Sequence, residues 1–448
     1  MFLYAALLSV AFAPYSQDSQ SGQADGMEPL PALQPGLPWT ILPRAETSFG
    51  AEVHGGWLYV LGGYHGVPHE YRAAGQSSDF YRVSLADPRL VEQLPSPGRV
   101  QSVSLDGHSG DLWRVGGMVI EDLDEYDSEM TSVDTVARFD PLQRAWEAMP
   151  SLPEGRSSHE TAVVAGTLYA VGGWRLPGED AWAKDMLALD LANPGEGWRS
   201  IPQPFERRAL AVAGTSQHVL AIGGISSDRS TPQRVDVYDV KTETWSLGPD
   251  FPGAAFAASA HAVGDRVYAT GRDGVVYRWE VGEDEWSEDG ADLTFPRFFG
   301  QLVGTDQGLY LLGGIGGMNR SGRIRAVEHL PFDGAEPMAS SFGVPLPAGM
   351  LPSGDVQLDG GSLHLRDGSG SQWNLRLTDL AWSRIEAAPQ EAAVDSAVQE
   401  AAASTGVLDL RGRRLGWTLL PGAHAVQVAF HLEPIPAPNR AQPERNKK

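Results

Sequence analysis

The feature that most constrains this chain is an apolar run that ends in glycine and recurs along most of its length. Six clear copies and a fainter seventh follow one another at intervals of about 50 residues. They are LYVLGG, LWRVGG, LYAVGG, VLAIGG, VYATGR, LYLLGG and LHLRDG, and they begin at Leu58, Leu112, Leu168, Val219, Val267, Leu309 and Leu363. A single sheet of short strands leaves both faces uncovered, whereas a ring of sheets packed face to face buries them. The repeat therefore predicts an all-β ring.

The third repeat shows how each unit divides into four short strands. Its first strand follows Arg156, its second ends at Gly173, its third covers residues 186–190, and Trp198 begins its fourth. The glycine pair allows backbone angles that larger residues avoid. A tryptophan near the last strand supplies a large apolar body between neighbouring sheets, and the sequence offers this residue at Trp146, Trp198, Trp245, Trp286 and Trp382.

An arginine or histidine near the first strand, a double glycine after the second, a Tyr-Asp or Phe-Asp turn and then a tryptophan together resemble the kelch repeat. The resemblance covers residues 38–385 and implies a kelch-type β-propeller built from four-stranded blades. These motifs are specific for the fold and not for a function, because one such fold hosts many activities.

The number of blades depends on the seventh repeat. Residues 271–286 align with residues 367–382 so that both segments end in tryptophan. This match predicts seven blades, and the alternative is six blades followed by an unrelated C-terminal region. The segment WTILP at residues 39–43 is expected to complete the last blade, a place for which Trp382 competes.

The ends of the chain differ in composition from the repeats. Residues 1–13 hold an apolar run that is too short to span a bilayer and has the form of a signal-peptide core. We therefore expect an exported protein, periplasmic, secreted or at the cell surface, with no membrane span after processing; a mis-assigned start or an uncleaved anchor are the alternatives. Residues 14–37 are expected to form a flexible linker and residues 386–404 a short helical insertion. Residues 405–432 are expected to form a small C-terminal β segment and residues 433–448 a disordered tail.

Charge and cysteine content exclude several functions. The chain has 57 acidic and 34 basic residues and a formal net charge of −23, and such a field repels nucleic acids and anionic membranes. It has no cysteine, so disulfides, thiolate metal ligands and cysteine nucleophiles are excluded. The copper oxidases among kelch-type propellers need a cysteine linked to a tyrosine, so their chemistry is excluded too, and no cofactor is expected.

Five repeats carry an arginine shortly before the first strand. These residues are Arg44, Arg99, Arg156, Arg207 and Arg297. A ring would bring them toward one entrance and form a cationic mouth, which suits an anionic small molecule, a glycan or an acidic segment of a protein partner. The alternative is a structural role, in which each arginine binds neighbouring backbone or acidic groups.

Proton acceptors near these arginines are the candidates for catalysis. They are His159, Glu160, Glu46 and Glu206. The kelch resemblance includes epimerases that act on sialic acid, so an epimerase or mutarotase working on an acidic sugar is the alternative function. A structural role for His159 competes with this interpretation, since the repeat usually carries a histidine there.

An acidic stretch at residues 121–129 is the one candidate for metal binding. Its potential ligands are Glu121, Asp122, Asp124 and Asp127. The stretch lacks the regular ligand order and the turn glycine of a calcium loop, which favours a solvated acidic loop over a metal site.

The sequence thus favours a binding module over an enzyme. The arginine-bearing face, with the long loops of the first three repeats, is the predicted binding surface because function in such rings collects on loops at one face. A purely architectural role at the cell surface is a third alternative.

Overall fold

The computed structural model describes residues 33–332, apart from 35, 179–180, 289–290 and 317–321. Beyond these it describes residues 341–345, 355–359, 362–366, 371–376, 381–385, 404–410, 413–421 and 425–432. The described chain is almost entirely β, with two short 3-10 helices, η1 (Ala73–Gly75) and η2 (Pro194–Glu196). None of its helices is long and apolar enough to cross a membrane. The predicted signal segment, helical insertion and tail lie outside the described residues, except that Ser404 is in a strand.

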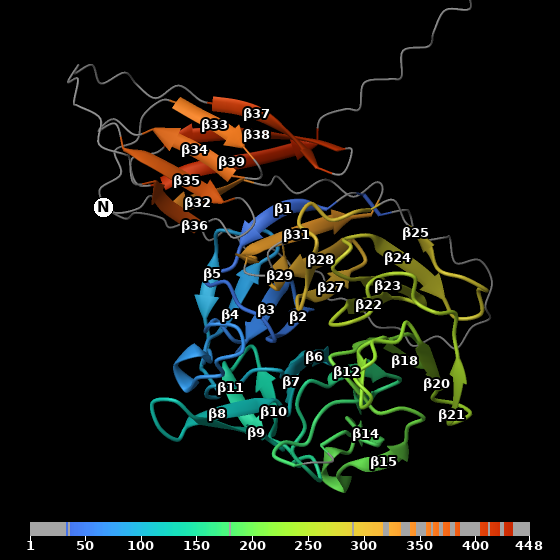
Figure 1. Ribbon diagram of the computed structural model, residues 1–448. Coiled ribbons are helices and arrows are strands. Elements are labelled where there is room, and N and C mark those ends of the chain that lie inside the picture. The colour runs from blue at the N-terminus through green and yellow to red at the C-terminus, as the bar shows by residue number, and fades with distance from the viewer. Residues whose placement is uncertain are drawn as a thin grey trace, which may run out of the picture. The chain divides into compact units, whose positions relative to one another are not determined.

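Six four-stranded antiparallel sheets form the blades of a ring (Figure 1). Blade 1 consists of β2 (Gly50–His54), β3 (Trp57–Leu61), β4 (Phe80–Ser84) and β5 (Val91–Gln93). Blade 2 consists of β6 (Ser104–His108), β7 (Asp111–Val115), β10 (Val136–Asp140) and β11 (Ala145–Ala148). Blade 3 consists of β12 (Glu160–Val164), β13 (Thr167–Val171), β14 (Asp185–Asp190) and β15 (Arg199–Pro202). Blade 4 consists of β17 (Ala211–Gly214), β18 (His218–Ile222), β20 (Val235–Asp239) and β21 (Thr244–Leu247). Blade 5 consists of β22 (Ser259–Val263), β23 (Arg266–Thr270), β24 (Val276–Glu280) and β25 (Ser287–Glu288). Blade 6 consists of β27 (Gln301–Thr305), β28 (Gly308–Leu312), β31 (Ala326–Pro331) and, from the start of the chain, β1 (Leu37–Ile41).

The ring closes through the sixth blade. The innermost strands β2, β6, β12, β17, β22 and β27 contact one another in turn, and β27 contacts β2. Strand β1 pairs antiparallel with β31, so the blue start of the ribbon lies beside its orange sixth blade (Figure 1). The WTILP segment therefore completes the last blade, as the sequence predicted. Its Trp39 is 1% exposed and packs edge-on against Tyr310, with ring centroids 5.0 Å apart.

The prediction of seven blades is wrong, and the alternative of six is correct. The segment proposed as the seventh blade does form a four-stranded sheet, from β33 (Asp355–Asp359), β34 (Ser362–Arg366), β35 (Gln372–Arg376) and β36 (Ala381–Ile385). None of these described strands is hydrogen-bonded to a blade, and the contact between blades 6 and 1 leaves no gap for another. The ring ends at Pro331 rather than at residue 385. A second sheet, ordered β32-β39-β38-β37, contains β32 (Ser341–Pro345), β37 (Ser404–Leu410), β38 (Arg413–Pro421) and β39 (Ala425–Leu432).

Four of the five predicted tryptophans join consecutive blades, and the fifth, Trp382, lies in β36 outside the ring. Each indole N–H near the last strand of one blade donates to a proline carbonyl at the end of the preceding blade, over 2.8 to 3.1 Å. The pairs are Trp146 with Pro95, Trp198 with Pro150, Trp245 with Pro202 and Trp286 with Pro249. The large ring covers apolar surface between two sheets while its polar atom keeps a partner.

We predict that Trp39 is needed for ring stability. Replacing it with alanine removes a buried aromatic side chain from the seam between the two ends of the ring, and should lower the free energy of unfolding by about 3 to 5 kcal/mol. Denaturant unfolding followed by fluorescence measures the change. The control Leu142→Ala alters a side chain that is 95% exposed and should change stability by less than about 0.5 kcal/mol. Equal effects of the two substitutions would contradict the closure described here.

Candidate functional site

The glycine pairs connect each blade to the next and define equivalent positions around the ring. The second glycine of a pair donates its N–H to a carbonyl of the following blade: Gly63 to Val100, Gly117 to Arg156, Gly173 to Arg207, Gly224 to Ala255 and Gly314 to Glu46, over 2.8 to 3.1 Å. The first glycine has no room for a side chain, since a Cβ on Gly172 would lie 2.6 Å from the Arg207 carbonyl oxygen. We call the residue that supplies this carbonyl the entry position of its blade.

Buried arginines occupy the entry position of blades 3 and 4, and Arg297 holds the equivalent place in blade 6 by its strand register. Arg156 donates to the Ala170 and Asp185 carbonyls and to the Asp185 carboxylate, 2.7 Å away. Arg207 and Arg297 form the same kind of network with Asp236 and Glu328, and all three arginines are at most 2% exposed. Their charges are neutralised inside the blades, so the predicted cationic mouth is not built from them. The structural alternative is correct for these three residues.

Arg44 and Arg99 do not share this position. Both side chains are exposed, and Arg44 lies 3.6 Å from the Asp79 carboxylate. The hydrogen bonds of the glycine pairs place Glu46 and Val100 at the entry positions of blades 1 and 2 instead. Arg44 and Arg99 lie one or two residues farther from their glycine pairs than the other three arginines do. This displacement places their side chains in solvent rather than inside the blade. The five predicted arginines therefore do not converge.

At the entry position of blade 1, Glu46 carries a charge opposite to that of the three buried arginines. Its side chain is fully buried, and Ser77 is the group that most opposes the effect of burial on its pKa. Burial raises the pKa of Glu46 to about 7, an effect that Asp79 strengthens and that Arg44 and Arg323 oppose. Arg323 comes from the sixth blade and donates to the His65 carbonyl over 2.7 Å and to the Gly66 carbonyl.

A ring of backbone groups, which we call the collar, narrows the entrance to the channel along the ring axis. It contains one residue per blade with positive φ, between 46° and 57°: Ser48, Ser102, Ser158, Ala209, Ala257 and Phe299. Five hydrogen bonds of 2.6 to 3.3 Å connect each N–H to the carbonyl of the preceding collar residue, from Ser102 to Phe299. Blades 1 to 3 supply serines and blades 4 to 6 supply apolar side chains. The collar residues line a cavity of about 50 Å³.

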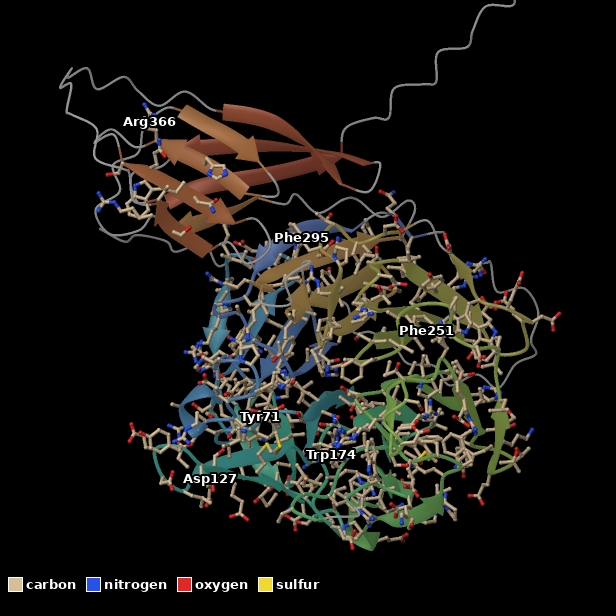
Figure 2. The ribbon with its side chains drawn as sticks, viewed as in Figure 1. Tyr71, Asp127, Trp174, Phe251, Phe295 and Arg366 are labelled. Carbon is tan, nitrogen blue, oxygen red and sulfur yellow. The ribbon has the colours of Figure 1, made fainter. Side chains whose placement is uncertain are left out.

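Aromatic side chains and an arginine stand next to the collar. Arg208, beside collar residue Ala209, places its guanidinium carbon 3.7 Å from the Trp174 ring and 5.7 Å from the Trp182 ring. Burial lowers the pKa of Arg208, and the nearby Tyr71 hydroxyl opposes this effect. Figure 2 labels Tyr71 and Trp174, which lie in loops of blades 1 and 3. No carboxylate lies within ion-pair distance of Arg208 in the part of the chain that the structure describes.

Further aromatic residues extend this surface. Tyr71 lies 6.3 Å from Tyr64, whose ring is 5.9 Å from the guanidinium carbon of Arg323. On the opposite side, Phe256, Phe298 and Phe299 form a cluster with ring centroids 5.1 to 6.4 Å apart. We call this surface the loop face; it comprises the collar, Arg208, Arg323 and the aromatic residues around them.

The candidate catalytic residues lie in different environments. His159 is buried, and burial together with the charge of Arg156 lowers its pKa to about 3, so its ring is neutral. Glu160 faces the central channel. Glu206 is partly exposed and lies 4.0 Å from Lys184. Together with the buried Glu46, these residues do not form one catalytic group.

The acidic stretch forms a hairpin between β8 (Met118–Asp122) and β9 (Ser128–Ser132). Arg72 holds its tip, donating to the Asp124 and Asp127 carbonyls and lying 3.2 Å from the Asp122 carboxylate. Glu121 is exposed. Among the described residues, no three histidine or acidic groups are placed to hold a metal ion. The arrangement is that of a solvated hairpin anchored by an ion pair.

Sequence reasoning missed Arg208 and two acids of the channel. Arg208 directly follows the buried Arg207. Successive side chains of a strand point to opposite sides, and this alternation was the one sequence signal that Arg208 would be accessible. The channel is lined by residues from all six innermost strands and encloses about 230 Å³. Of its three acids, Glu160 was among the predicted candidates, whereas Glu52 and Asp106 were missed; their place in the inner strands is the signal that was available.

Comparisons with known proteins agree with this architecture. The Kelch motif family matches residues 206–252. Kelch-like protein terF of Aspergillus terreus is 24% identical over 244 residues, which cover 54% of this chain and 49% of that protein. Kelch-like protein 35 of Mus musculus is 27% identical over 196 residues, covering 43% of this chain and 29% of the relative. The chain thus spans half or less of the length of these relatives.

One solved structure, reported as the structure of YjhT, resembles the fold. The TM-score is 0.52 at 15% identity, and the match covers 66% of this chain and 97% of that one. At this identity the likeness supports the fold and carries no residue roles.

We predict that Arg297 stabilises the fold through Glu328. Arg297→Met leaves the buried Glu328 carboxylate without its counter-charge and should cost about 3 to 5 kcal/mol, whereas Arg297→Met with Glu328→Gln, which removes the charge and keeps an acceptor for the Thr294 and Phe295 N–H groups, should recover much of this loss. Arg199→Met is the control, because that arginine pairs with Glu243 at the surface and is worth at most about 1 kcal/mol. Chemical denaturation measures all three. A double variant as unstable as the single one would argue against a buried pair.

We predict that Glu46 makes stability depend on pH. A buried carboxyl whose pKa is higher in the folded than in the unfolded protein opposes folding once the unfolded protein ionises it. The free energy of unfolding therefore falls as pH rises from about 4.5 to 7. Glu46→Gln should therefore stabilise the protein by up to about 3 kcal/mol at pH 8 and have little effect at pH 4. Melting curves across this range test the difference, with the exposed Glu243→Gln as the control. A gain that is independent of pH would contradict the burial of an ionisable group here.

Proposed function

Because this chain is a kelch-repeat β-propeller, we propose that it is a binding module that takes an anionic ligand on its loop face. The ligand class comprises small carboxylic acids, acidic glycans and acidic segments of a protein partner. Kelch domains generally mediate binding, and the loops at one face of a ring are where such surfaces vary.

Arg208 is the observation that carries the proposal. The entry-position arginines Arg156, Arg207 and Arg297 are each neutralised by a carboxylate, whereas Arg208 stacks on Trp174 without one. In a chain with a net charge of −23, an uncompensated guanidinium beside a concave entrance attracts anions. Its stacked position orients the planar fork, which reduces the entropy lost when a carboxylate binds.

The neighbours of Arg208 favour a sugar acid within this class. Aromatic rings pack against the apolar faces of sugar rings, and Trp174, Trp182 and Tyr71 surround the guanidinium. The serines of the collar supply hydroxyl groups that hydrogen-bond with a polyhydroxylated ligand. The loop face therefore combines a charge, stacking surfaces and hydroxyls in the proportions that a saccharide site needs.

A second candidate function is an isomerase that acts on the same ligand. Its candidate proton acceptor is Glu46, whose pKa of about 7 suits proton transfer at neutral pH, although its side chain is fully buried. Following the interconversion of sialic acid anomers by NMR separates the two functions. Acceleration by the protein that is lost in Glu46→Gln supports the isomerase, whereas the rate of buffer alone leaves the binding module.

We also propose that the protein is exported. The proposal rests on the apolar run within residues 1–13, which has the length of a signal-peptide core. Expression of the full chain followed by N-terminal sequencing of the extracytoplasmic fraction tests it. A cut near residue 13 supports export, and an intact start in the cytoplasm argues against it.

We predict that the loop face prefers acidic to neutral sugars and that Arg208 determines this preference. Calorimetry with glucuronate and N-acetylneuraminate, and with glucose as the neutral counterpart of glucuronate, measures the preference. Arg208→Ala should weaken binding of the acids by about 1.5 to 3 kcal/mol, the range for hydrogen bonds to charged groups. Arg199→Ala, on the outer strand β15, should bind like the parent. Equal affinity for glucose and glucuronate, or an unaffected Arg208→Ala, would refute the proposal.

A further inference from the structure

The channel along the ring axis holds a second cavity, next to that of the collar, whose carboxyl groups all come from one side. Consecutive blades 1, 2 and 3 contribute the carboxyl groups of Glu52, Asp106 and Glu160 to its wall. Blade 5 contributes Ser259, His261 and the partly buried Ala260 and Ala262, and blades 4 and 5 contribute no charged group. The cavity encloses about 230 Å³, enough for a small organic molecule rather than a few isolated waters.

The acidic side has no counter-charge in the protein. No lysine or arginine is among the residues that line the cavity. Burial raises the pKa of Glu160 to about 8 and of Asp106 to about 6, and burial together with Asp106 raises that of Glu52. Protons therefore occupy the place that a cation would take, and a bound cation would release them.

Neutral acceptors complete the polar wall. Burial lowers the pKa of His261 to about 4, so its ring is uncharged at neutral pH. The ring has no hydrogen-bond partner among the described residues, and it lines the same cavity. A neutral imidazole nitrogen beside carboxylates accepts hydrogen bonds from an ammonium group, which has three N–H donors and no acceptor.

The spacing of these groups decides the size of the occupant. In the described part of the chain, no three acidic or histidine side chains are close enough to ligate one metal ion. A cation that satisfies them must therefore be a molecule that reaches the carboxyl groups one at a time. Its uncharged part would lie against the partly buried Ala260 and Ala262 of β22, where burial of hydrocarbon is favourable.

We propose that this cavity binds a short aliphatic diamine, with its ammonium groups at the carboxyl groups of blades 1 to 3 and its hydrocarbon chain toward Ala260 and Ala262 of blade 5.

The ligand enters from the end of the ring remote from the loop face. At the collar side, Glu160 accepts a hydrogen bond from Gln301 over 3.1 Å, and these residues belong to blades 3 and 6 on opposite sides of the channel. Both also line the small cavity of the collar. The larger cavity extends instead toward Gly107, Gly214 and Ala262, near the far ends of the inner strands.

Calorimetry of the full-length protein with 1,4-diaminobutane at pH 7.5 tests the proposal. We expect saturable binding with release of protons, seen as a heat that varies with the ionisation enthalpy of the buffer. The uncharged 1,4-butanediol should not bind, and Mg²⁺ should bind at least tenfold more weakly than the diamine. Absence of diamine binding, binding of the diol with equal affinity, or a preference for Mg²⁺ would each overturn it.

Substitutions locate the site. Asp106→Asn and Glu160→Gln should each weaken diamine binding at least tenfold, whereas Glu206→Gln, which alters a carboxylate near Lys184 and outside the cavity, should not change it. The melting temperature of each variant without ligand reports folding. Should an amide variant fail to fold, the rise in melting temperature of the parent with diamine concentration remains a test, because a ligand bound to the folded state stabilises it. Variants that fold and bind like the parent would exclude the channel.

Discussion

The structure depends on backbone hydrogen bonds between consecutive blades. At five of the six seams the second glycine of a pair donates to the next blade, and five hydrogen bonds between collar residues join consecutive blades nearer the axis. Both contacts require backbone angles that few residues adopt, which is why glycine recurs at one position and why the collar carries positive φ. Because strand β1 pairs with β31, the last seam closes and every inner strand faces the channel.

This closure determines which charges are available for binding. An arginine at the entry position points into its own blade, where the carbonyls and a carboxylate surround it, as with Arg207 and Asp236. The next residue in the chain points the other way because side chains alternate in extended backbone. In blade 4 that residue is Arg208, which stands against Trp174. A difference of one residue thus separates a stabilising arginine from one that can meet a ligand.

The sequence was sufficient for the fold class and insufficient for the blade count and the site. The glycine pairs and the tryptophans report contacts between neighbouring blades, and most repeats show one or both of them. The blade count failed because residues 355–385 form a four-stranded sheet with the same local pattern, whereas ring closure depends on the distant pairing of β1 with β31. The arginine ring failed because Arg44 and Arg99 are displaced from the entry position, and such a displacement is recognised only through the hydrogen bonds to the glycine pairs.

We propose that the loop face binds an acidic sugar between Arg208 and the tryptophans of blade 3. Indole N–H resonances of the protein, recorded while glucuronate is added, test it most directly. We predict that the signals of Trp174 and Trp182 shift with saturation, while those of Trp146 and Trp245, whose indoles join blades through Pro95 and Pro202, stay in place. Unchanged signals for Trp174 and Trp182 at saturating ligand, or shifts confined to the other tryptophans, would contradict the account.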